Sequence, residues 1–118
     1  MKVTRVYADS SGETHFEDIE MKLADAGPIG RLSEPVPVGK LVFRKNDPHY
    51  DYDWHNAPAR QYIVLLDGAI ELEVSDGEKR VLQGGEILLM EDVTGKGHRT
   101  RHVEPRERRS LFIVLDDQ

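Results

Sequence analysis

The stretch DYDWHNAPARQYIVLLDGAIELEVSDGEKRVLQGGEILLMEDVTGKGH, residues 51–98, decides the fold. It consists of apolar runs typical of β-strands, separated by short turn pairs. The turn pairs are Asp67-Gly68, Asp76-Gly77 and Gly84-Gly85. A histidine stands near each end of the stretch, at positions 55 and 98. We expect a small β-barrel that brings these two imidazoles into one interior pocket.

The apolar runs differ in their periodicity. Residues 61–66 are apolar at both odd and even positions, which indicates a strand covered on both faces. Residues 70–74 alternate apolar with polar, as in a strand with one face in water. The Asp-Gly pair at 67–68 predicts a hairpin between these two strands, and the pair at 76–77 predicts a second one. Other expected strands are 2–7 at an edge, 41–44, 79–82, 86–90, 98–103 and 111–115. Residues 16–23 are expected as a strand, with a short helix as the alternative. Short strands without a convincing long helix predict an all-β, antiparallel sandwich or barrel.

Composition bounds the function. The chain has 118 residues, enough for one domain over residues 1–118, and a net charge of −6. It lacks the cationic footprint of a nucleic-acid-binding protein. The basic side chains between Lys96 and Arg109 are interrupted by acids and by Pro105, so we expect a solvated strand face rather than an anion site. With no cysteine, no signal core and no apolar run of membrane-spanning length, a cytoplasmic protein without a membrane partner is expected.

Two motifs in residues 41–115 resemble those of the cupin superfamily, and specifically of a small, single-domain, RmlC-like conserved-barrel cupin. In the first motif His55 keeps the family's first histidine, whereas Ala57 and Gln61 replace the second histidine and the glutamate. The second motif opens at Gly85-Glu86 and ends at His98. The resemblance implies an antiparallel double-stranded β-helix (jelly roll), with a barrel at residues 41–115 covered by residues 1–40.

The loop at residues 92–97 replaces the family's usual turn before this last histidine. It is interpreted either as a rigid loop that aims the histidine or as ordinary turn chemistry.

Side-chain parity indicates which polar groups enter the interior. Residues of equal parity face one side of a strand, so His55 with Gln61, and His98 with Thr100 and His102, are expected to share the pocket. Polar groups in an apolar interior need a metal ion, ordered water or a polar ligand as partner. The histidines at 55 and 98 with Gln61 are the candidate ligands of a divalent transition metal, Fe, Mn, Zn or Ni. Side chains that bond one another and water are the alternative.

Two functions follow from this set. The first is a metal-dependent enzyme acting on a small polar metabolite, of the oxygenase, isomerase or lyase type that the resemblance implies, with His102 or Tyr62 as the catalytic proton-transfer group. The second is a non-catalytic ligand-binding or sensor cupin without a tightly bound metal, suggested by Ala57 and Gln61. In either case a homodimer is expected, because the two-sided strand at 61–66 needs cover.

Overall fold

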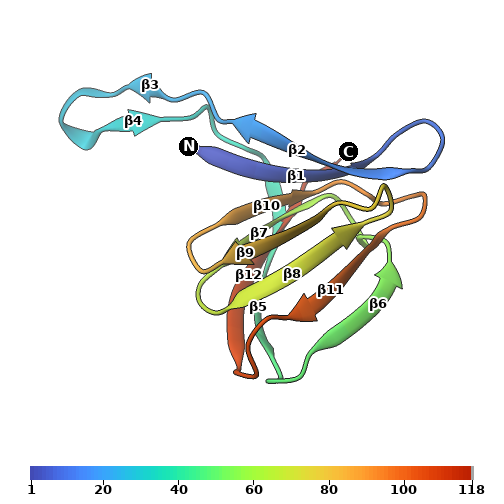
Figure 1. The fold of residues 1–118 in the computed structure, drawn as a ribbon. Helices are drawn as coiled ribbons and strands as arrows, with labels where there is room; N and C mark the ends of the chain where they lie inside the picture. Colours follow the sequence, from blue (N-terminus) through green and yellow to red (C-terminus); the bar gives the residue numbers. More distant parts are fainter. Residues whose placement is uncertain (118) are drawn as a thin grey trace.

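The computed structural model describes residues 1–117, which form two β-sheets facing each other in a jelly-roll barrel (Figure 1). The six-stranded sheet has the order β2-β1-β10-β7-β12-β5, and the four-stranded sheet has the order β6-β11-β8-β9. The first sheet comprises β1 (Lys2–Ala8), β2 (Thr14–Glu20), β5 (Val38–Asn46), β7 (Gln61–Leu65), β10 (Ile87–Met90) and β12 (Arg108–Leu115). The second comprises β6 (Asp51–His55), β8 (Ala69–Val74), β9 (Lys79–Gln83) and β11 (His98–His102). The predicted all-β, antiparallel class is confirmed, and β1 with β10 is the one parallel pair among these strands of residues 1–117.

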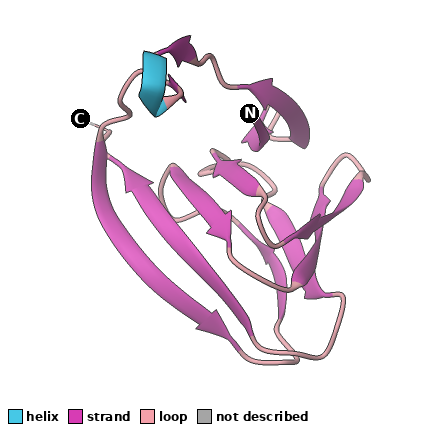
Figure 2. Cartoon of the chain, turned by 90° about the vertical axis from the view of Figure 1, so that its left-hand side faces the viewer, coloured by secondary structure: helices cyan, strands magenta, loops and turns pink. Residues whose placement is uncertain are grey.

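A short extension lies between β2 and β5. It holds the two-residue strands β3 (Ala24–Asp25) and β4 (Arg31–Leu32) around a 3-10 turn, Gly27–Ile29. Figures 1 and 2 show this extension projecting away from the two sheets, and its residues are exposed. In the part of the chain that the structure describes, no helix has the length and apolar character needed to cross a membrane.

One of the two expected hairpins is present and the other is not. The hairpin at Asp76-Gly77 is confirmed, because β8 and β9 pair antiparallel. The expected hairpin at Asp67-Gly68 is wrong: β7 belongs to the six-stranded sheet and β8 to the four-stranded sheet, so this turn crosses between the layers. Gly84 packs closely against this turn, since a Cβ at Gly84 would lie 2.8 Å from the Cα of Asp67. An Asp-Gly pair specifies a tight turn but not which sheet receives the next strand.

Two strand assignments also change. Residues 2–7 were expected at an edge, but β1 lies between β2 and β10. Residues 51–55 were not among the expected strands, yet they form β6, the edge strand of the four-stranded sheet, which pairs with β11. Alternating aspartates hid this strand, because its outer face is in water while the partner strand supplies the ladder.

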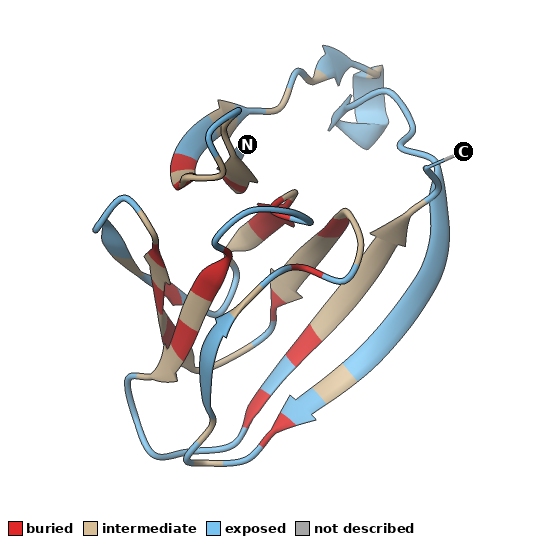
Figure 3. Cartoon of the chain, turned by 90° about the vertical axis from the view of Figure 1, so that its right-hand side faces the viewer, coloured by how far each residue is buried: buried red, intermediate tan, exposed pale blue. Residues whose placement is uncertain are grey.

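The core lies between the sheets, where both contribute apolar side chains. Its buried members are Val6, Phe16, Ala57, Leu65, Ile70, Leu72, Val74, Leu82, Leu88 and Met90. In contrast, β5 is exposed along most of its length (Figure 3). The core therefore fills one part of the barrel and leaves room for a cavity toward β5, β6 and β11.

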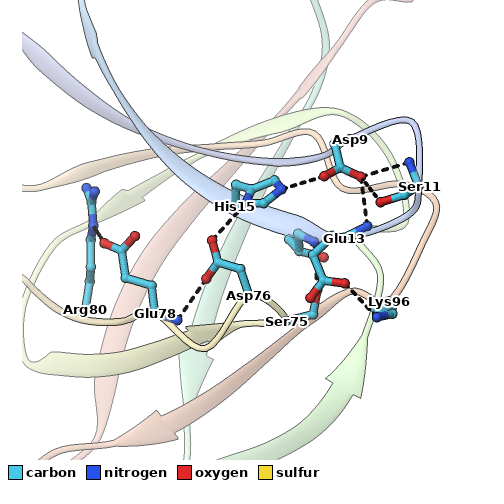
Figure 4. Close-up of polar contacts among 10 residues, drawn as sticks. Asp9, Ser11, Glu13, His15, Ser75, Asp76, Glu78, Arg80 and Lys96 are labelled. Atoms are coloured by element: carbon cyan, nitrogen blue, oxygen red, sulfur yellow. Dashed lines mark hydrogen bonds and ion pairs between the residues drawn. The ribbon is translucent and has the colours of Figure 1, made fainter.

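A polar cluster fixes the N-terminal hairpin over the four-stranded sheet (Figure 4). The ring of His15, on β2, contacts Asp9 through Nε2 at 2.7 Å and Asp76 through Nδ1 at 2.8 Å. Asp76 lies in the β8–β9 turn, so this histidine joins two hairpins that are distant in the sequence. Glu13 adds an ion pair with Lys96 of the loop before β11. These contacts position the loop that leads into His98.

Candidate functional site

A cavity of about 290 Å³ lies between the two sheets. Apolar side chains from both sheets form its middle, including Ile63, Leu72, Leu88 and Phe112. Its polar lining consists of Arg44, Tyr50, Tyr52, His55, Asn56, Gln61, His98, Thr100 and Arg108. This combination of an apolar wall and a few convergent polar groups is typical of a small-molecule site.

The structure brings the two imidazoles of the sequence motifs side by side. His98, the first residue of β11, pairs with His55, the last residue of β6. Their ring centroids are 4.3 Å apart, and the Tyr52 ring lies 3.9 Å from that of His55. Two residues far apart in the chain thus line one wall of the cavity.

The orientation of His98 is fixed by a buried carboxylate. Its Nδ1 lies 2.5 Å from Oδ2 of Asp92, and both side chains are buried. A carboxylate accepts hydrogen bonds, so Nδ1 donates and Nε2 is the nitrogen that remains for a ligand. Carboxylate–histidine pairs of this kind orient metal-ligating imidazoles and raise their basicity. Asp92 lies in the loop between β10 and β11. Its contact with the histidine six positions later leaves no periodic pattern in the sequence, so only the structure reveals it.

The orientation of His55 is fixed by a backbone carbonyl. Its Nδ1 donates to the carbonyl oxygen of Asp53 at 2.8 Å. Burial in the cavity is the main cause that lowers the pKa of this imidazole below its usual range. The ring is therefore neutral at pH 7, with an unprotonated Nε2. In both histidines an oxygen acceptor therefore holds Nδ1.

Gln61 lies on the opposite wall. It is the first residue of β7, 4% exposed, and lines the same cavity. The parity argument that joined it to His55 does not apply, because β6 ends at His55 and a loop of residues 56–60 leads into the other sheet. Gln61 faces the histidines because the two sheets face each other, and its amide is available to a ligand held between them.

His102 and Tyr62 lie outside this cavity. His102, at the end of β11, lines a separate, open depression near His49 and Glu104, and its Nδ1 contacts the carbonyl oxygen of Glu104 at 3.1 Å. Its Nε2 is buried without a hydrogen-bond partner. Tyr62 alternates with Gln61 and Ile63 and so points to the outer face of the six-stranded sheet. Their placement gives no support to a role in proton transfer at His55 and His98.

The predicted solvated face for the basic residues between Lys96 and Arg109 is wrong at one position. Arg108 was expected on a solvated face, but it is 5% exposed and lines the cavity. It begins β12 and has the same parity as Ser110 and Phe112, which also face inward. Extending the alternation of the last expected strand, 111–115, by three residues toward the N-terminus would have found it. Arg44 of the neighbouring β5 enters the same space.

Gly97 makes the approach of the two histidines possible. Its φ is +77°, and a Cβ there would overlap the carbonyl oxygen and carbon of His55. The adjacent loop is held by Asn56, whose Nδ2 donates to the carbonyl oxygens of Asp92 and Gly95 at 3.2 and 3.1 Å. Of the two interpretations of residues 92–97, these contacts favour a loop that aims His98.

The donor set fits a divalent ion held by two nitrogen ligands. Among the residues that the structure describes, no group of three or more His, Cys, Asp and Glu side chains could surround an ion. Two imidazoles whose Nδ1 atoms are already bonded and whose Nε2 atoms remain for coordination suit Zn, Ni, Fe and Mn, whereas the amide oxygen of Gln61 is a weaker, uncharged donor. The remaining coordination positions would be open to solvent or to a bound molecule.

Comparisons with known proteins agree with this fold. No family model matches the chain. The protein named "Oryzines biosynthesis cluster protein J" from Aspergillus oryzae is 33% identical over 83 residues, which cover 69% of this chain and 45% of that protein. This chain thus spans less than half the length of that relative.

Two solved structures have similar architecture. Protein NMB1881 from Neisseria meningitidis matches with a TM-score of 0.51 and 20% identity, over 64% of this chain and 72% of that one. The conserved protein SPY1581 of unknown function from Streptococcus pyogenes matches with a TM-score of 0.53 and 18% identity, over 74% of this chain and 71% of that one. Both are small β-rich proteins, and the likeness shows that this chain has a cupin-like fold.

Proposed function

We propose that this chain is an RmlC-like member of the cupin superfamily and a metal-dependent enzyme acting on a small polar metabolite. His55 and His98 would hold a divalent transition metal, Fe, Mn, Zn or Ni, with Gln61 as a further ligand. The observation that carries the proposal is the shared hydrogen bonding of the two rings: in each ring an oxygen acceptor holds Nδ1–H, which leaves Nε2 as the nitrogen that can coordinate an ion at the same cavity.

Each residue has a defined task in this proposal. Asp92 positions His98 through Nδ1, and the carbonyl oxygen of Asp53 does the same for His55. The apolar wall formed by Ile63, Leu72 and Leu88 excludes water from a bound metabolite. A bound ion would supply Lewis-acid polarisation of a metabolite oxygen. Oxygenase, isomerase and lyase reactions are all compatible with that chemistry.

The Aspergillus oryzae relative gives limited support to a metabolic role. Its printed name assigns that protein to a biosynthesis cluster, and the similarity covers 69% of the present chain. Because less than half of that protein is matched, the similarity supports small-molecule chemistry in general and no particular reaction.

Metal titration of the full chain tests the proposal. Protein purified without a metal-binding tag is stripped with chelator and titrated with Zn²⁺ and Mn²⁺ by calorimetry, and bound metal is quantified by elemental analysis. His55→Ala and His98→Ala are expected to abolish binding. His102→Ala is the matched control and is expected to retain it, because His102 lines a different depression. Absence of binding in the unmodified protein, or equal loss in all three variants, would contradict the proposal.

A ligand-binding or sensor protein without a tightly bound metal is the second candidate. It is favoured by the missing carboxylate ligand, since Ala57 and Gln61 add no negative charge to attract a cation. A thermal-shift screen with a metabolite library, followed by a turnover assay on each stabilising compound, separates the two candidates. Stabilisation without turnover, with or without metal, would favour the sensor.

We also propose that the chain forms a homodimer through the outer face of its six-stranded sheet. By strand register, one apolar strip crosses three neighbouring strands of that face: Leu41, Phe43, Tyr62, Val64, Leu111 and Ile113. Phe43 is 78% exposed, which is costly for a large aromatic side chain in water. A second copy would present the same strip, so one two-fold contact would cover both.

A further inference from the structure

Two arginines of the cavity lack an anionic partner among residues 1–117. Arg108 is 5% exposed, and its Nε is buried without a hydrogen-bond partner. Over residues 1–117, no ion pair joins Arg108 or Arg44 to a carboxylate. The neighbouring Asp67 is engaged by Arg109, through Nε at 2.7 Å. The two guanidinium groups therefore bring uncompensated positive charge to the cavity.

Aromatic rings provide the contacts that these guanidinium groups do have. The Cζ of Arg44 lies 5.1 Å from the ring centroid of Tyr50 and 5.0 Å from that of Phe112. The Cζ of Arg108 lies 5.7 Å from the centroid of Tyr50. Cation–π contacts fix the positions of the two groups but leave their N–H donors free. Burial and the nearby charge of Arg44 lower the pKa of Arg108, as expected for a cation that lacks an anion.

The strand register places this cationic end away from the metal ligands. Gln61 pairs with Val114 near the end of β12, whereas Arg108 is the first residue of that strand. Between Gln61 at one end and Arg108 at the other, Ile63 pairs with Leu88 and with Phe112. The cavity thus has an arginine end, an apolar middle and a histidine end.

We propose that the pocket binds a carboxylate with an apolar body, its carboxylate held by Arg108 and Arg44 and its opposite end presented to His55 and His98. The inference rests on the proposed function, because it names the substrate class of the same site. A planar carboxylate matches the fork of donors on a guanidinium group, and charge-assisted bonds of this type are strong.

A phosphate fits this end of the cavity less well. Phosphate sites in proteins draw on several backbone N–H groups at helix N-termini or nests. Here Arg44 and Arg108 lie on strands, where the ladder between β5 and β12 uses backbone N–H groups in regular pairing. Charged side chains alone face the ligand, and the two of them suit one carboxylate.

The test compares a carboxylate with its neutral and phosphorylated counterparts. Full-length protein, chelator-treated and metal-loaded, is titrated with hexanoate, octanoate and benzoate, with hexanamide and benzamide, and with hexyl phosphate. Binding is followed by calorimetry and by ligand-observed NMR. The acids are expected to bind with a measurable Kd up to millimolar concentration, and the amides at least about tenfold more weakly, a loss of about 1.4 kcal/mol.

Arginine variants assign the binding to its residues. Arg108→Gln is expected to weaken hexanoate binding about tenfold or more, as for loss of a charged hydrogen-bond partner. Arg44→Gln, on the adjacent strand, gives a second measurement if the Arg108 variant does not fold. Lys45→Gln is the matched control on β5 beside Arg44, since Lys45 faces solvent and pairs with Glu107; it is expected to leave binding within about twofold.

The outcomes separate this inference from the proposed function. Any of four results would overturn the inference, whatever the metal titration gives. They are equal binding of acids and amides, tighter binding of hexyl phosphate than of hexanoate, no binding of any acid, and unchanged binding in both arginine variants. Carboxylate binding that depends on Arg108 but occurs in a protein unable to bind metal would support the inference and contradict the metal-dependent function.

Discussion

Asp92 and His98 form a buried pair in which Oδ2 and Nδ1 are 2.5 Å apart. The carboxylate belongs to the loop after β10 and the imidazole to the start of β11. Asp92 also contacts the loop that follows β6, because its carbonyl oxygen accepts from the backbone N–H of Ala57 at 3.2 Å. The pair therefore couples the orientation of one candidate metal ligand to the loop that follows the other.

Replacing this carboxylate tests its positioning role. Asp92→Asn is expected to lower affinity for Zn²⁺ about 10–100-fold, because an amide no longer fixes Nδ1–H and the Nε2 lone pair as firmly. Calorimetric titration measures the change, and circular dichroism checks that the fold persists. Asp53→Asn is the control: Asp53 acts through its backbone carbonyl, and its side chain is 83% exposed. Equal effects of the two substitutions would contradict the assignment.

Gly97 is expected to be required for the site as well as for the fold. Gly97→Ala forces a Cβ into the backbone of His55 at a φ of +77° and should reduce the free energy of unfolding by about 3 kcal/mol. Urea unfolding measures this loss. At temperatures where the variant stays folded, metal affinity should fall too, because the two imidazoles are moved apart.

Gly77→Ala is the matched comparison. Gly77 also has a positive φ, +98°, but a Cβ there meets nothing within 4 Å. Only the backbone cost of about 1 kcal/mol is expected, with metal binding unchanged. If Gly97→Ala costs no more than Gly77→Ala, the close approach at His55 is not a constraint.

The His15 cluster predicts a pH dependence of stability. Hydrogen bonds to Asp9 and then Asp76 raise the pKa of His15, since only the imidazolium donates from both nitrogens. Its contribution is fully present below the unfolded imidazole pKa of about 6.5 and is lost as pH rises through the raised folded value. On the acid side, the pKa of Asp9 is held low chiefly by the Ser11 hydroxyl, so stability falls as pH drops below about 4.

The melting temperature of the native chain minus that of His15→Gln is therefore expected to decrease between about pH 6 and pH 8. Taking this difference cancels the opposite contribution of His55, whose pKa is lowered. Thermal melts followed by circular dichroism at constant ionic strength measure the difference. His49→Gln, at an exposed position, is the control and should keep the slope of the native chain. A difference between the two melting temperatures that stays constant or grows as pH rises through this interval would argue against the cluster.

The proposed homodimer predicts that a charge on the outer sheet face dissociates the protein. Phe43→Asp should give a monomer by light scattering at micromolar concentration, because it buries a carboxylate in the apolar contact. Val81→Asp places the same charge on β9 of the other sheet, where Val81 is 52% exposed, and should leave the dimer intact. A native chain that is already monomeric would contradict the proposal.

Sequence patterns led to the two imidazoles for a sound physical reason. His98 begins an expected strand whose alternation is local, so its face can be read from its neighbours, whereas His55 was placed by the resemblance of the first motif. Gln61 was placed in the pocket by an argument that fails, because the chain changes sheets between it and His55. Arg108 was misplaced on the surface, since charge patterns alone do not reveal whether a strand face is covered.

By itself, the sequence determined the all-β class, most strand segments and the hairpin at Asp76-Gly77, because these depend on periodicity and turn chemistry between near neighbours. Only the tertiary structure decided that β7 and β8 lie in different sheets, that Asp92 holds His98, and that His102 points into a different depression from His98. Pairing, burial and polar contacts between distant segments depend on where the rest of the chain lies, and local alternation carries no record of that.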